Sequence, residues 1–194
     1  MKQLVSRCTS WFAGAGMCVA LTLAVLIPGL ALAGSYDDYF RAIKIDNAPV
    51  VQNLLAQGFD PNTIEPQRGD SGLILALREE SMSVFRTLLD APEIDIHARA
   101  FNGDTALMIA AFKGNRVAVD ALIARGAEVQ HPGWTPLHYA AMGGHNDIVK
   151  LLLDRGAQLD ARSPNNTTPV MMAAWGGKIY TVKLLLDVGA DAML

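Results

Sequence analysis

A short pattern that recurs with a period near 33 residues constrains this chain more than any other feature. A threonine, a proline or alanine, three further residues and two alanines occupy residues 105–111, 135–141 and 168–174. Each copy is followed by an apolar segment that ends at Gly126, Gly156 or Gly189. Self-similarity at such a period is typical of stacked repeats, in which each unit contacts only its neighbours, and it argues against a single closed core.

Aligning the copies gives five units, at about 36–67, 68–100, 101–130, 131–163 and 164–194. Each unit is predicted to form a helix, a short turn, a second helix and a loop. Asp, Ser and Thr side chains accept hydrogen bonds from the free N–H groups of a first helical turn. On this basis the predicted N-caps are Asp37, Ser71, Thr105, Thr135 and Thr168. Glycines favour the left-handed conformation in which helices end, and they stand at the expected positions Gly114, Gly144 and Gly177.

The unit at 131–163 shows the pattern most fully. It contains Gly133-Trp134-Thr135-Pro136-Leu137-His138, then Gly143-Gly144-His145, and finally Arg155-Gly156-Ala157. In these motifs the chain resembles ankyrin-repeat proteins, and the resemblance covers residues 36–194. It implies an all-α solenoid of paired antiparallel helices with projecting loops. It also implies protein binding on the concave face that the loops and the first helices form.

Several positions depart from this pattern. The first unit has Asp37 in place of Thr and Asp46-Asn47 in place of Gly-His, which is typical of a polar capping unit. The second unit has Ser71-Gly72 for Thr-Pro, Glu80 at the helix-ending glycine and Asp90-Ala91-Pro92 at its close, so we expect irregular helices there. The loop around His131 is three residues shorter than the next one, which predicts a tight turn with an exposed histidine.

The first 33 residues are predicted to be a signal peptide. Lys2 and Arg7 precede an apolar stretch at 11–32, and Ala31-Leu32-Ala33 fits a cleavage site before Gly34. The alternative is an uncleaved membrane anchor, because the stretch has about the 20 residues needed to span a bilayer. Both cysteines lie in this leader, so the mature chain would have no thiol, which suits an oxidising compartment. The expected location is therefore periplasmic or secreted.

Charge and motifs exclude several classes of function. Removing Lys2 and Arg7 leaves 14 basic against 19 acidic side chains, a net charge of −5 that opposes nucleic-acid binding. The histidine spacings fit no metal site, and no nucleophile elbow or phosphate-binding loop is present. We therefore expect neither a metal nor another cofactor, and we expect a binding module rather than an enzyme. Within the resemblance, His138 and His145 are expected to be structural hydrogen-bonding residues.

The resemblance places partner-facing residues just before each motif threonine and just after each alanine pair. We select as candidate partner-binding residues Arg78, Asp104, Phe112, Lys113, Trp134, Met142 and Trp175. The aromatic and methionine side chains fall at equivalent sites in adjacent units, where they would form a contiguous apolar patch. The alternative is that Phe112 and Trp134 fold over their neighbours as part of the core.

Two further expectations concern partners. The last unit has apolar Val182, Leu185 and Leu186 where a terminal repeat normally presents a polar outer face, which suggests a homodimer through the C-terminal end. The main functional prediction is a protein-binding module that acts outside the cytoplasm. An inhibitory, immunity or accessory subunit of a specific exported enzyme is the alternative, because the residues do not distinguish the two.

Overall fold

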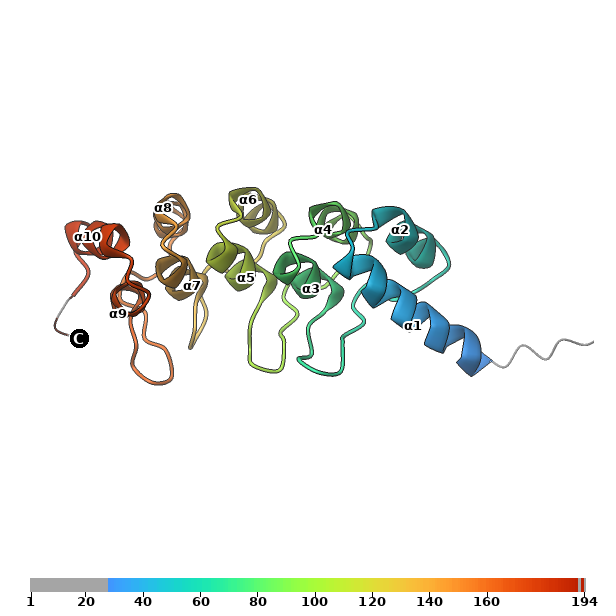
Figure 1. Cartoon of the computed structure of the whole chain (residues 1–194). Helices are drawn as coiled ribbons and strands as arrows, with labels where there is room; N and C mark the ends of the chain where they lie inside the picture. Colours follow the sequence, from blue (N-terminus) through green and yellow to red (C-terminus); the bar gives the residue numbers. More distant parts are fainter. Residues whose placement is uncertain (1–27, 192, 194) are drawn as a thin grey trace, which may run out of the picture.

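The computed structural model describes residues 28–191 and 193, and within them ten helices form two layers (Figure 1). The inner helices are α1 (Pro28–Lys44), α3 (Gly72–Arg78), α5 (Ala106–Lys113), α7 (Pro136–Gly143) and α9 (Pro169–Trp175). The outer helices are α2 (Ala48–Ala56), α4 (Met82–Leu89), α6 (Arg116–Ala124), α8 (Asn146–Asp154) and α10 (Ile179–Asp187). Consecutive inner and outer helices form pairs that stand in a row, and long loops project beyond the inner layer. The predicted all-α solenoid is confirmed.

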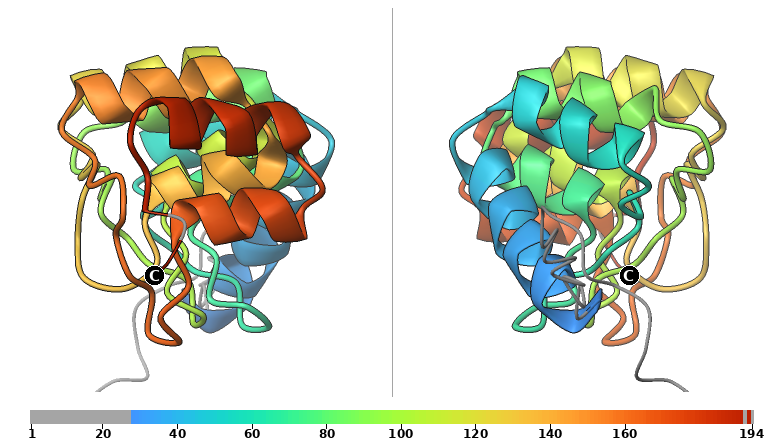
Figure 2. Two further views of the ribbon diagram at one scale, coloured as in Figure 1. Left: turned by 90° about the vertical axis from the view of Figure 1, so that its left-hand side faces the viewer. Right: turned by 90° about the vertical axis from the view of Figure 1, so that its right-hand side faces the viewer.

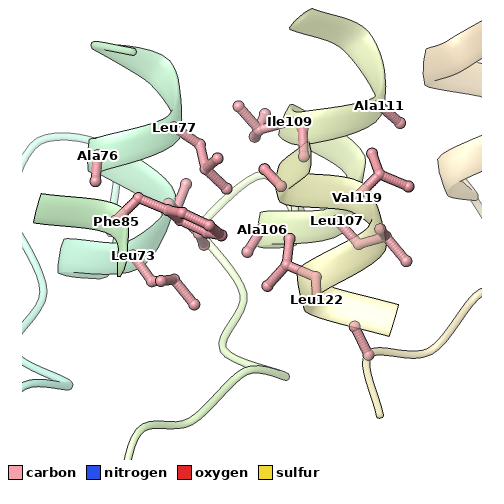
Figure 3. Close-up of a cluster of buried hydrophobic side chains, with 14 of the residues drawn as sticks. Leu73, Ala76, Leu77, Phe85, Ala106, Leu107, Ile109, Ala111, Val119 and Leu122 are labelled. Carbon is pink, nitrogen blue, oxygen red and sulfur yellow. The ribbon is translucent and has the colours of Figure 1, made fainter. Parts of the chain in front are cut away.

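Apolar contacts between neighbouring helix pairs form the core. Figure 3 shows Leu77 and Phe85 of the second pair opposite Ala106, Ile109 and Leu122 of the third, and all five side chains are buried. Because each pair has one apolar side toward the preceding pair and another toward the next, the core runs along the whole row instead of closing around one centre.

The predicted caps are confirmed at four of the five units. Ser71, Thr105, Thr135 and Thr168 each precede the first residue of an inner helix in an extended conformation. The Thr105 hydroxyl, for example, accepts a hydrogen bond from the Met108 N–H at 3.3 Å. The prediction for Asp37 is wrong, because α1 already begins at Pro28 and Asp37 lies inside it. Pro28 suits a first helical position, and no proline interrupts the helix before Lys44.

The predicted irregularity of the second unit appears at its turns. Glu80, at the turn between the helices of the second unit, has φ 59°, and Asp46, at the same turn of the first unit, has φ 53°. Both adopt the left-handed conformation in which the other units have glycine. The Asp46 carboxylate accepts hydrogen bonds from the N–H groups of Ser83 and Val84, both at 2.9 Å. Ser81, the N-cap of α4, makes no side-chain cap, so a residue of the first pair caps the helix of the second.

The structure explains why glycine replaces proline at position 72. A Cβ atom on Gly72 would lie 2.0 Å from the Tyr39 hydroxyl oxygen. The Tyr39 side chain is fully buried, and its hydroxyl donates a hydrogen bond to the Pro61 carbonyl at 3.0 Å. The aromatic ring therefore occupies the space that a larger residue at position 72 would need.

Most of the predicted leader, residues 1–27, lies outside the described residues. The predicted cleavage point after Ala33 falls within α1. Among the residues that the structure describes, no helix is both long enough and apolar enough to cross a membrane.

Candidate protein-binding surface

Three apolar side chains stand at equivalent positions near the C-terminal ends of three adjacent inner helices. Phe112 is on α5, Met142 on α7 and Trp175 on α9, and we call them the apolar row. Trp175 is 77% exposed and Phe112 is 40% exposed, whereas Met142 is half-buried. Phe112 therefore does not fold into the core, and the row offers apolar area to solvent.

Glycine backbone brings the members of the apolar row together. A Cβ on Gly143 would lie 2.6 Å from the Phe112 carbonyl oxygen, and a Cβ on Gly176 would lie 2.7 Å from the Met142 carbonyl oxygen. Real Cβ atoms do not approach backbone this closely, so only glycine permits these contacts. The ends of α5, α7 and α9 consequently lie in close contact through their backbones, which sets the three side chains in one strip along the inner helices.

Trp134 directly precedes Thr135, the N-cap of α7, so it lies at the other end of this helix from Met142, and it is partly enclosed. It is half-buried, and its ring contacts the ring of His138 edge to face, with centroids 5.3 Å apart. Such a contact is favourable beyond the area it buries. Trp134 therefore lies between the two alternatives of a binding residue and a core residue. One side of its ring packs against the repeat, and the other side remains accessible.

His138 ties two helix pairs together, as the resemblance implied. Its Nδ1 lies 3.2 Å from the Thr135 N–H and 2.9 Å from the Thr135 hydroxyl, while its Nε2 lies 2.9 Å from the Thr167 carbonyl. The neutral ring satisfies all three contacts if Nε2 carries the proton. Burial lowers the pKa of His138, and the nearby His131 lowers it further.

The other two histidines of this region differ in how well they were predicted. His145 is structural, with Nε2 2.9 Å from the Phe112 carbonyl of the preceding pair. His131 was expected to be exposed, and this is wrong, because its side chain is buried. The short loop turns back against the preceding loop, so that the ring shares a small hollow with Ile96 and Arg99. Its Nδ1 lies 2.9 Å from the Pro132 carbonyl.

The two charged candidates in the N-terminal half are paired with each other. Arg78 Nη2 donates a hydrogen bond to Asp104 Oδ2 at 2.7 Å, and Arg78 Nε lies 2.9 Å from Asp70 Oδ2 in an ion pair. Asp104 is only 4% exposed, so its carboxylate is engaged within the chain, and its selection as a partner-binding residue stays a prediction. Burying an unpaired carboxylate is costly, and the arginine supplies the compensating charge from the neighbouring helix pair.

Tyr139 completes this network, although the repeat pattern gave no reason to select it. Its hydroxyl donates a hydrogen bond to Asp104 Oδ1, while Asn102 Nδ2 donates to Asp104 Oδ2 at 2.9 Å. Burial and the Asp104 carboxylate raise the pKa of Tyr139 well above its usual value, so the hydroxyl keeps its proton at neutral pH. The network extends over three helix pairs, since Arg78 is on α3, Asp104 precedes α5 and Tyr139 is on α7.

Lys113, the remaining candidate, pairs with Glu80 at 3.0 Å near the surface. An exposed pair of this kind contributes little stability and leaves both charges accessible to a partner. Within residues 28–191, no group of three or more histidine, cysteine or acidic side chains is arranged to hold a metal ion. The arrangement therefore offers an apolar strip beside charged residues that mostly satisfy one another.

The fold and this surface define a repeat protein with an exposed inner face. The model of the family described as ankyrin repeats (3 copies) matches residues 40–132 and 128–194. The chain therefore belongs to the ankyrin-repeat family, whose repeats generally mediate protein–protein interactions.

Known proteins with similar sequences share parts of the chain. This chain is 35% identical over 133 residues to SH3 and multiple ankyrin repeat domains protein 1 of Homo sapiens. The aligned region covers 66% of this chain and 6% of that protein. The chain is 31% identical over 120 residues to B-cell lymphoma 3 protein homolog of Mus musculus, with 58% of this chain and 27% of that protein covered. The chain thus spans about a quarter or less of the length of these curated relatives.

Proposed function

We propose that this protein binds another protein through the apolar row, Lys113 beside Phe112, and Trp134 at the start of α7. The observation that supports this is the exposure of Phe112 and Trp175 on a strip that backbone contacts hold in place. Large apolar side chains on a rigid surface supply binding energy at a small cost in ordering. No cofactor is part of the proposal, and binding rather than catalysis is the proposed activity.

We also propose that the protein acts outside the cytoplasm, in the periplasm or after secretion. The basic start, the apolar stretch and the Ala31-Leu32-Ala33 site support export, as does the absence of cysteine after Cys18. Intact-mass measurement of the protein recovered from cells tests this. A mass that starts at Gly34 is expected, and a mass that retains the leader would support the membrane-anchored alternative.

Affinity capture with matched variants tests the binding surface. Immobilised protein is exposed to the extracytoplasmic fraction of its source, alongside the variants Trp175→Ala and Phe112→Ala. The control is Val117→Ala, which removes a side chain that is also exposed but lies on the outer helix α6. A captured protein should be lost with both inner-face variants and retained with the control. Equal capture by all four proteins would reject the apolar row as the binding site.

The identity of the captured protein separates two versions of the proposal. If the partner is an exported enzyme, titrating this protein into an assay of that enzyme should change its activity and reach a plateau at a fixed stoichiometry. That result would support an inhibitory, immunity or accessory subunit. An unchanged activity at saturation would support a scaffold that binds without regulating.

A further inference from the structure

The last described helix pair has an apolar side against which no described helix packs. We define the end face as Met171 and Ala174 of α9 together with Ile179, Val182 and Leu186 of α10. Ile179 is 77% exposed and Leu186 is 42% exposed, and neighbouring Tyr180 is 83% exposed. Figure 2, left, looks onto this end, where α9 and α10 lie in front of the other helix pairs.

The corresponding side of the preceding helix pair is an established interface within the chain. In the 33-residue register the end face corresponds to His138, Ala141, Asn146, Val149 and Leu153. Ala141 and Val149 are fully buried against the last pair, whereas Ala174 is exposed and Val182 is half-buried. In the preceding helix pair this surface packs against the next pair. In the last described pair no described helix packs against it.

The polar groups that join one helix pair to the next are absent from this end. Asn146 Oδ1 accepts a hydrogen bond from the Thr181 hydroxyl at 2.6 Å, and His138 Nε2 contacts the Thr167 carbonyl. At the equivalent positions the last pair has Ile179, which cannot accept such a bond, and Met171, which cannot donate one. The end face therefore suits an apolar partner surface better than the polar edge of a further repeat.

The opposite end of the stack carries charged and polar side chains as well as the exposed Ile45 and Val50, so a head-to-tail contact would cover polar groups. Arg41 lies 3.5 Å from Asp38 on α1, and Gln57 donates a hydrogen bond to Asn53 at 3.1 Å where α2 ends. These side chains are exposed. Covering them with the end face would desolvate polar groups without giving them new partners, which is unfavourable.

We propose that the end face binds the end face of a second copy of this chain, forming a two-fold symmetric dimer. In an isologous contact each apolar residue meets apolar residues of the same patch. With the two α10 helices antiparallel, Ile179 of one copy meets Leu186 of the other, and Val182 lies near the two-fold axis. The charged side chains of α10 are Lys183 and Asp187, one of each sign, so net charge does not oppose the contact.

The available area points to a dimer of moderate affinity. Trp175 and Tyr180 flank the end face, and aromatic side chains can each bury about 150–250 Å². With the aliphatic residues of the end face, the contact approaches the roughly 800 Å² per partner of a standard interface. We therefore expect dissociation in the micromolar range, with a monomer in dilute solution and a dimer in concentrated solution.

Sedimentation velocity across a range of concentrations tests the dimer. The wild-type protein should shift from monomer to dimer and stop there, whereas Ile179→Glu and Leu186→Glu should remain monomeric at every concentration. Val117→Glu is the control, since it places the same charge on an exposed site of α6, and it should dimerise like the wild type. Circular dichroism melting checks that the variants fold. A wild-type protein that stays monomeric at high concentration, or variants that dimerise normally, would overturn the proposal.

Hydrogen–deuterium exchange locates the contact and separates it from the binding surface. Amides of α9 and α10 should become more protected as the protein concentration rises, while those of α2 should not change. Growth beyond a dimer, or protection at α1 and α2, would indicate head-to-tail association and contradict the two-fold contact. Ile179→Glu should still capture the partner of the apolar row, so either proposal can fail without the other.

Discussion

The inner face of this stack has two halves that resemble each other in backbone and differ in chemistry. In the N-terminal half, Arg78 lies between Asp70 and Asp104, and all three side chains are largely buried. In the C-terminal half, the positions equivalent to Arg78 hold Phe112, Met142 and Trp175, two of which are exposed. The charged half thus uses its side chains to hold helix pairs together, while the apolar half leaves them available.

This difference shows that residue type alone does not identify a binding surface. Charged residues on a repeat surface invite a functional interpretation, yet the Asp104 carboxylate accepts three hydrogen bonds within the chain, from Arg78, Tyr139 and Asn102. Apolar residues invite a core interpretation, yet Trp175 has most of its surface in solvent. Whether a position is available depends on what the neighbouring pair places beside it.

The largest expected loss of stability comes from a core residue, and the losses expected for the two halves of the inner face can be compared with it. Leu152→Ala removes a fully buried side chain on α8, in the apolar core that joins the helix pairs. The lost transfer free energy and the cavity should lower the free energy of unfolding by about 2–5 kcal/mol. Urea denaturation followed by circular dichroism measures it. A loss smaller than that of a surface variant would mean that the stack does not derive its stability from contacts between pairs.

Breaking the charged network should cost less, but it should still be a stability effect. Asp104→Ala leaves the Arg78 guanidinium and the Tyr139 hydroxyl without their shared acceptor, which should cost about 1–3 kcal/mol. The value lies below that of a fully buried pair because Arg78 is partly exposed. A double-mutant cycle with Tyr139→Phe should show coupling between the two sites. Additive losses would mean that the network does not act as a unit.

Acid should weaken the junction at His138, which joins the fourth and fifth helix pairs. The folded-state pKa of His138 is lowered, so its contribution is complete above the unfolded pKa and is lost as pH falls through the folded value. Protonation adds an N–H at Nδ1, which then faces the N–H of Thr135. His138→Met introduces the residue that two other units carry at this position, Met108 and Met171, and it should cost about 0.5–1.5 kcal/mol at neutral pH. The gap between variant and wild type should narrow between neutral pH and pH 5, and a constant gap would contradict this role.

The smallest expected effect on stability belongs to the apolar row. Phe112→Ala removes an exposed side chain and should change the free energy of unfolding by no more than about 0.5 kcal/mol. Thermal melting beside the Val117→Ala control measures this. A loss comparable with that of Leu152→Ala would return Phe112 to the core and would remove the contrast between the two halves.

Features that repeat along the chain could be predicted from the sequence. The caps at Thr105, Thr135 and Thr168 follow local hydrogen-bonding rules, so their positions define the helix pairs. The contact between Arg78 and Asp104 could not be predicted in this way, because it joins residues 26 apart whose side chains meet only after two pairs have stacked. Tyr139 offered one clue, since it is polar where Leu75, Ile109 and Met172 are apolar.

Two other misses have equally local physical causes. Asp37 is a residue type that often caps a helix, which predicts a helix start at this position. In the structure α1 continues through Asp37, because no residue between Pro28 and Asp37 interrupts the helix. The burial of His131 depends on how a shortened loop turns against its neighbour, and loop length alone does not specify that direction.

Gly143 and Gly176 have a consequence for how this protein can change over time. They contribute no side-chain atoms to the proposed contact with a partner, yet they fix how far apart Phe112, Met142 and Trp175 stand. A substitution at either glycine would have to push two helix ends apart and would widen the spacing of the aromatic groups. The breadth of the surface is therefore encoded at sites that a scan of contacting residues would pass over.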